Sequence, residues 1–222
     1  MRFGSVAALA VLLAGCGEIT SQNNAASNIE TPANAPGPDA AQQRPIPCAV
    51  ERHGMGAVIN GSADAACDSS VDPQAIGLDE LIRIIPDQHP AFYYILAKRL
   101  FDAGRRDEAV FWMYAGQLRY RIRLACHTDL APDTEPALYA SLMETVGRPV
   151  NEYAGGDPVA WANAIERARN WDAGTRNGFE PKAACANAIA QQREGMGQLI
   201  TQLRADPDAI RRQRTQNGLP NR

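Results

Sequence analysis

The sequence lacks the short motifs by which several enzyme classes are identified. It contains no glycine-rich phosphate loop, no G-x-S-x-G nucleophile turn and no H-E-x-x-H zinc helix. Its three histidines, His53, His89 and His127, are far apart in the chain, and there is no C-x-x-C pair. Because a structural zinc site needs closely spaced Cys and His ligands, we expect no metal site, and we expect no cofactor.

Positive charge is scarce over the chain as a whole. The 222 residues carry 22 Lys and Arg against 25 Asp and Glu, a formal net charge of −3. Domains that bind nucleic acid are typically basic, so this balance argues against a nucleic-acid partner. Few segments alternate polar and apolar residues with the period of two that half-buried strands show. We therefore expect a mainly α fold.

The first sixteen residues, MRFGSVAALAVLLAGC, carry one basic residue at Arg2 and an apolar run over residues 6–14 that is too short to span a bilayer. They end in LAGC, and the whole segment resembles the signal of bacterial lipoproteins. The resemblance implies that residues 1–15 are removed, that Cys16 is acylated and that the lipid holds the protein in a membrane. Because Gly17 follows, it also implies an outer-membrane lipoprotein facing the periplasm. An ordinary cleaved signal is the alternative.

The sequence contains five cysteines, an odd number for an exported protein. If Cys16 carries lipid, an even set remains for the oxidising compartment that the signal implies. We favour a disulfide between Cys48 and Cys67, which bracket a glycine-rich segment, and another between Cys126 and Cys185, which lie at the ends of two predicted helices. Two other pairings are possible for four cysteines, and metal binding by Cys and His is a further alternative.

Composition divides the remaining chain into two parts. Residues 17–46 are rich in Ala, Asn, Gln, Pro and Ser, and their only large aliphatic residues are three isoleucines. Such a segment cannot bury enough surface to offset its ordering entropy. We therefore expect a lipidated N-terminus and flexible tether over residues 16–46 and a disulfide-stapled helical domain over residues 47–222. Within that domain, residues 48–72 have weak periodicity and are expected to form a loop.

From residue 73 onward the pattern is helical. Asp-Pro pairs recur at residues 72–73, 157–158 and 206–207, and each places an N-cap carboxylate before a proline that suits the first turn of a helix. Apolar residues then follow at three- and four-residue spacing. A helix from about Pro136 is expected to end at Val146, because Gly147 and Pro149 follow. The other expected helices lie over about residues 73–85, 158–171 and 181–203, and after 206.

Residues 91–124 predict two helices joined at Gly104, which permits a left-handed turn, with Asp107 capping the second helix. They resemble a tetratricopeptide unit at Tyr93, Leu96-Ala97, Gly104, Asp107-Glu108-Ala109 and Gly116. They depart from that pattern at Met113 and in lacking a proline near Arg123. No second copy follows at a period of 34 residues, and a repeat array needs about three units. The resemblance thus implies one tetratricopeptide-like helical hairpin inside a compact domain.

Three further segments, FWMYAGQLRYR, VGRPVNEYA and QNGLPNR, resemble a family of uncharacterised bacterial proteins. Together with the hairpin they span much of residues 86–222. That family transfers no activity, so the resemblance implies only a single domain.

Charge is unevenly distributed along the chain. Residues 91–124 contain seven Lys and Arg against three Asp and Glu, a local balance of +4, and residues 204–222 add five arginines against two aspartates. If these segments pack side by side, a positive face would attract an acidic protein, an anionic glycan or lipid headgroups. The alternatives are a solvated face of paired arginines and aromatic side chains that belong to the core. The candidate partner-binding residues are Trp112, Arg119, Tyr120 and Arg123.

Paired carboxylates for glycosidic cleavage are a further possibility. The candidates near Trp161 are Glu135, Glu144, Glu152 and Glu166. In the absence of catalytic signatures, our leading hypothesis is a lipid-anchored, non-enzymatic protein-interaction module with an unidentified envelope protein as its partner, acting as an assembly factor or as an inhibitor of the immunity type. A peptidoglycan- or glycan-acting enzyme and a purely structural spacer lipoprotein are the alternatives.

Overall fold

The structure is a computed structural model that describes residues 73–180 and 185–222. The predicted signal peptide, tether, 48–72 loop and Cys48–Cys67 disulfide lie outside these residues. The described part of the chain is mainly α, as predicted, and contains no strand. None of its helices is long and apolar enough to cross a membrane.

The predicted helical hairpin is confirmed, but the prediction that Asp107 caps its second helix is wrong, because Asp107 lies within the first turn and no side chain caps that helix. Helix α3 (Ala91–Asp102) and helix α4 (Arg106–Cys126) are joined by a tight turn in which Gly104 has a φ of 78°, a left-handed conformation that favours glycine. The two helices approach most closely at Gly116, where a Cβ atom would lie 2.4 Å from the Cβ of Tyr93. The hairpin is preceded by α2 (Leu78–Ile84) and a short 3-10 turn, η3 (Ile85–Asp87).

The prediction that a helix ends at Gly147 and Pro149 is wrong. Helix α5 (Glu135–Leu142) continues through a π-helical turn, η4 (Met143–Gly147), into α6 (Arg148–Gly155). In the π turn the N–H of Arg148 donates to the carbonyl of Met143, five residues back instead of four. A proline in a regular α-helix lacks an N–H and its ring clashes with the carbonyl four residues earlier. The wider turn before Pro149 lets the chain stay helical in spite of that clash.

Two of the predicted Asp-Pro caps are confirmed. At the start of α7 (Pro158–Gly174), the Asp157 carboxylate accepts hydrogen bonds of 3.1 Å from the N–H groups of the second and third helical residues. At the start of α9 (Pro207–Gln216), Asp206 accepts a bond of 2.8 Å. Between them lies α8 (Ala186–Ala205). These carboxylates satisfy amides that have no partner within their helices.

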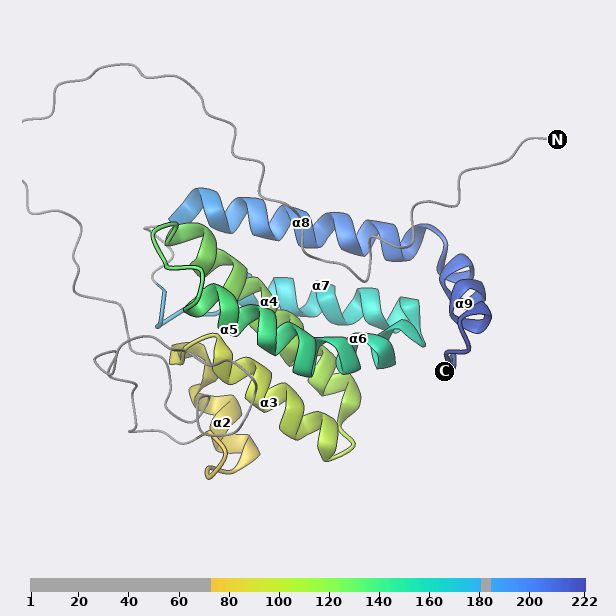
Figure 1. Cartoon of the computed structure of the whole chain (residues 1–222), viewed down its shortest axis with the longest axis horizontal. Coiled ribbons are helices and arrows are strands. Elements are labelled where there is room, and N and C mark those ends of the chain that lie inside the picture. The colour runs from red at the N-terminus through yellow and green to blue at the C-terminus, as the bar shows by residue number, and fades with distance from the viewer. Residues whose placement is uncertain (1–72, 181–184) are drawn as a thin grey trace, which may run out of the picture. The chain divides into compact units, whose positions relative to one another are not determined.

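Helix α4 is the centre of the domain. It contacts α3, α7, α8, α6 and α5, and in Figure 1 it crosses between α8 along the upper edge of the view and α2 and α3 along the lower edge. Because other helices surround it, α4 buries side chains on nearly every side, aromatic residues included. A helix in this position has no broad side that faces solvent, so residues predicted on α4 to contact a partner are expected to lie in the interior.

Candidate functional site

The four residues predicted to bind a partner are all buried. The exposed fraction is 8% for Trp112, 1% for Arg119, 0% for Tyr120 and 1% for Arg123. The expectation that they form an exposed surface is therefore wrong, and the alternative that the aromatic side chains of α4 belong to the core is correct for Trp112 and Tyr120. The alternative of a solvated face of arginines is wrong for Arg119 and Arg123, which are buried as well. Two of them are arginines, which are rarely buried without a partner.

Arg119 is held by α3, by η3 and by the C-terminal end of α7 with the residues that follow it. Its Nε lies 3.1 Å from Oδ1 of Asp172, and its Nη1 donates to the hydroxyl of Tyr93 at 2.5 Å. Two backbone carbonyls, those of Pro86 and Arg176, accept its other hydrogen bonds at 2.9 and 3.0 Å. The guanidinium is fully paired inside the protein, so it joins three parts of the fold and offers nothing to a ligand.

Arg123 lies one turn further along α4 and binds two carboxylates. Its Nε and Nη2 donate to the two oxygens of Glu135 at 2.5 and 2.6 Å, a bidentate pair, and its Nη1 donates to Glu180 at 3.0 Å. The guanidinium also lies 4.8 Å from the centre of the Phe179 ring. Glu135 begins α5 and Glu180 follows α7, so one arginine links three separate segments.

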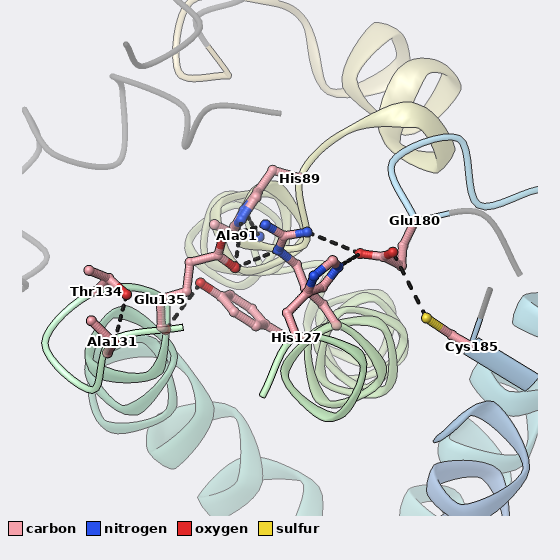
Figure 2. Close-up of polar contacts among 10 residues, drawn as sticks. His89, Ala91, His127, Ala131, Thr134, Glu135, Glu180 and Cys185 are labelled. Carbon is pink, nitrogen blue, oxygen red and sulfur yellow. Dashed lines mark hydrogen bonds and ion pairs between the residues drawn. The ribbon is translucent and has the colours of Figure 1, made fainter. Parts of the chain in front are cut away.

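His89 extends this network toward α3 (Figure 2). Its Nδ1 accepts a hydrogen bond of 3.1 Å from the N–H of Ala91, so the neutral ring carries its proton on Nε2. Nε2 lies 3.3 Å from Oε2 of Glu135 but is not aligned for a hydrogen bond, and we regard this contact as electrostatic. Burial lowers the pKa of His89 and keeps the ring neutral.

Glu135 is ionised although it is buried. Burial alone would raise the pKa of Glu135, but the adjacent His89 ring and the bidentate pair with Arg123 outweigh that effect and hold the pKa at about 2. Because the carboxylate keeps its charge at all ordinary pH values, its ion pair with Arg123 persists as well.

At the other end of the network, Glu180 faces His127 and the disulfide (Figure 2). Nε2 of His127 lies 2.9 Å from Oε2 of Glu180. The predicted pairing of Cys126 with Cys185 is confirmed, with their Cα atoms 5.7 Å apart. Sγ of Cys185 lies 4.0 Å from Oε1 of Glu180, a contact and not a donated hydrogen bond, since a disulfide sulfur carries no proton. The disulfide and the polar network therefore fix the same end of α4.

The predicted catalytic carboxylates do not share one environment. Glu135 belongs to the buried network, Glu144 is exposed and paired with Arg148 at 2.5 Å, and Glu166 is paired with an arginine of α8 at 2.7 Å. Trp161 is buried and donates its indole N–H to the hydroxyl of Tyr114. The segment VGRPVNEY, expected as a loop, is the π turn and the start of α6. Of the four carboxylates, Glu152 lines a surface groove to which the other three do not contribute.

That hollow is an open groove of about 460 Å³ on the described part of the domain. The hairpin turn, α6, α9 and residues 220–222 form its walls. Two aromatic rings, those of Phe101 and Tyr153, meet in it at a right angle with their centres 5.8 Å apart. Three arginines line it beside these rings: Arg106, Arg214 and Arg222.

The C-terminal residues fold back onto α6 to complete the groove. The N–H of Arg222 donates to the carbonyl of Gly156 at 2.9 Å, and its guanidinium stacks 4.0 Å from the centre of the Tyr153 ring and pairs with Asp107 at 3.0 Å. A Cβ at Gly156 would lie 3.1 Å from Cγ of Arg222, and a Cβ at Gly155 would lie 2.8 Å from Nη1 of Arg214. The two glycines thus leave room for both arginines to lie against α6.

Of the groove residues, sequence reasoning selected only Glu152 as a candidate site residue. Two of the segments that resemble uncharacterised bacterial proteins, VGRPVNEYA and QNGLPNR, both contribute to the groove, which is a signal that could have singled them out. Their proximity depends on the return of residues 217–222 onto α6, and no local pattern encodes that return.

The described residues contain no group of three His, Cys, Asp or Glu side chains placed to hold a metal ion. Comparisons of the chain with protein-family models, with curated proteins and with solved structures find no match. The geometry of the groove and of the buried network is therefore the basis for any functional conclusion.

Proposed function

We propose that this protein is a lipid-anchored lipoprotein of the cell envelope whose helical domain is a non-enzymatic protein-interaction module, acting as an assembly factor or as an inhibitor of the immunity type. The groove between the hairpin turn, α6 and α9 is its contact site. The observation that carries this proposal is that the groove presents arginines beside aromatic rings at the surface, whereas the buried arginines Arg119 and Arg123 are paired with carboxylates inside the domain.

Aromatic and arginine side chains supply most of the binding energy in many protein interfaces. In this groove the stacking of Arg222 on Tyr153, and its hydrogen bond from Nε to the Tyr153 carbonyl at 3.3 Å, restrict its rotamers before any partner arrives. Side chains that are ordered in advance lose less entropy on binding. The groove is therefore suited to hold a segment of another macromolecule.

The proposed anchor is Cys16, and its test is fractionation. The variant Cys16→Ser should move the protein from the membrane fraction to the soluble periplasm, because the thiol is the attachment atom for the lipid and a single acyl chain already gives some membrane affinity. Continued membrane association of Cys16→Ser would contradict acylation at this residue.

The contact site is tested by site-specific crosslinking in living cells. A photo-reactive phenylalanine analogue at Phe101 lies in the groove, and the same analogue at Gln198, an exposed residue of α8, serves as the matched control. The proposal expects a crosslinked envelope protein from position 101 and none from position 198, with the partner identified by mass spectrometry. No product at position 101, or the same products at both positions, would contradict the groove as the contact site.

A further inference from the structure

We propose that the groove binds an acidic segment of a partner protein, with the guanidinium groups of Arg106 and Arg214 each pairing with a carboxylate of that segment. This inference rests on the proposed interaction function and adds the chemical class of the partner. It follows from the state of these two arginines, which have no bonded carboxylate in the described structure, whereas the third arginine of the groove, Arg222, pairs with Asp107 at 3.0 Å.

Arg106 has no hydrogen-bond or ion-pair partner among the residues that the structure describes. Its guanidinium lies over two rings of the groove, 5.1 Å from the centre of Phe101 and 5.6 Å from the centre of Tyr153. The neighbouring Arg105, in contrast, is paired with Glu108 at 2.6 Å. Stacking on aromatic faces holds a guanidinium in place and leaves its N–H edges available, which is the geometry that binds a carboxylate with two parallel hydrogen bonds.

Arg214 is partly buried and incompletely paired within the described structure. Its Nη2 donates to the carbonyl of Pro220 at 2.9 Å, and its Nε is buried without a hydrogen-bond partner. Burial lowers the pKa of Arg214, and the nearby carboxylate of Glu152 opposes this shift only in part. Partial removal of this cation from water is unfavourable while it lacks a bonded anion, so a carboxylate that pairs with its Nη groups would offset that cost.

The groove favours a peptide over an anionic lipid surface or a polyphosphate. Its rings and two prolines, Pro149 and Pro220, provide apolar contact area next to the charges. It also contains the Glu152 carboxylate, which repels a dense array of phosphates but can accept a hydrogen bond from a peptide N–H. A volume of about 460 Å³ lies in the range of sites that hold small ligands and suits a short segment.

The test measures the affinity of the full chain carrying Cys16→Ser for a fluorescein-labelled peptide of alternating Glu and Leu, by fluorescence anisotropy. The matched peptide replaces each Glu by Gln. The variants are Arg106→Gln, Arg214→Gln and their combination, and the control is Arg204→Gln, which removes an exposed arginine of the same charge that is paired with Glu166 outside the groove. Each groove substitution should weaken binding by roughly tenfold or more, since it removes a charged donor that pairs with a carboxylate of the peptide.

The control variant should retain the affinity of the parent chain, and the Gln peptide should bind at least tenfold more weakly than the Glu peptide. Equal affinity for the two peptides, or unchanged affinity of the double variant, would overturn the proposal. So would binding to vesicles of phosphatidylglycerol that depends on Arg106 and Arg214 while the Glu peptide is not bound, because the ligand would then be a lipid headgroup.

The two proposals fail in different ways. A crosslinked partner from position 101 together with no preference for the acidic peptide would leave the interaction function standing and refute its ligand class. Selective binding of the acidic peptide in solution, together with no crosslinked partner in cells, would support the chemistry of the groove and contradict the proposed function.

Discussion

The buried arginine Arg123 allows a quantitative test of what holds this fold together. Replacing it by Met keeps most of the aliphatic stem and removes the guanidinium. The carboxylate of Glu135 then loses two hydrogen bonds of 2.5 and 2.6 Å, and Glu180 loses one of 3.0 Å, while both carboxylates stay buried. Removing one partner of a buried ion pair typically destabilises a protein by about 3–5 kcal/mol.

A loss of that size is large compared with the total stability of a domain, which is about 5–15 kcal/mol. For a domain of this size it corresponds to a fall in Tm of roughly 10 °C. The assay is unfolding by urea or heat without reductant, followed by far-ultraviolet circular dichroism, so that the Cys126–Cys185 disulfide stays closed in every sample. The disulfide must stay closed because it fixes the same end of α4.

The matched control is Arg83→Met. Arg83 is paired with Glu80 at 2.5 Å, but their side chains are 71% and 49% exposed, and water screens such a pair so that it contributes little to stability. A second variant, Arg123→Met with Glu135→Gln, removes the unpaired charge and should recover part of the loss. If Arg123→Met were no more destabilising than Arg83→Met, the reasoning that assigns Arg123 a central role in stability would be wrong.

Three further predictions concern stability. Gly116→Ala should destabilise the protein by roughly 1–3 kcal/mol, because the added Cβ would lie 2.4 Å from the Cβ of Tyr93 and would push α3 away from α4. Urea unfolding measures this loss, and stability equal to that of the parent would contradict the close approach of the two helices. The free energy of unfolding should fall with acidification. The pKa of His89 is lowered in the folded state from its ordinary value of about 6.5, and that of Glu135 is lowered from about 4.3 to about 2. Each contribution to stability is therefore complete above the ordinary pKa and is lost as the pH falls from that value through the lowered pKa of the folded state. Urea midpoints of Glu135→Gln should therefore depend less on pH below about 4.3 than those of the parent, and equal slopes would refute this account. Asp157→Ala should lower stability by about 1 kcal/mol, because two amides at the start of α7 lose their acceptor. The midpoint of thermal unfolding measures this loss, and an unchanged midpoint would show that water replaces the cap.

Local sequence patterns predicted those parts of the fold that depend on local chemistry. The Asp-Pro caps at Asp157 and Asp206 and the turn at Gly104 each depend on a few adjacent residues, and each was predicted. The end of a helix at Pro149 was predicted wrongly, because the chain avoids the proline clash by widening one turn and not by breaking. A π turn has no short sequence signature, so the continuous helix from α5 to α6 could not be read from the pattern.

The candidate site was harder to predict because it depends on residues that are distant in sequence. Arg119 pairs with Asp172, 53 positions away, and Arg123 with Glu180, 57 positions away. A count of charges within residues 91–124 cannot detect such partners. For this reason a local balance of +4 indicated an exposed basic face where the structure has two buried, neutralised arginines.

The difference between arginines that are paired inside the domain and arginines that are not also explains which of them can bind a partner. The predicted positive face required the hairpin to lie beside residues 204–222. The groove shows this arrangement, because Arg106 from the start of α4 lines the same hollow as Arg214 and Arg222. Arg222 is neutralised by Asp107 at 3.0 Å, whereas Arg106 and Arg214 have no bonded carboxylate in the described structure. Within the groove, the charge left for a partner is therefore that of Arg106 and Arg214, and substitutions at these two residues should affect binding without the loss of stability expected for Arg123.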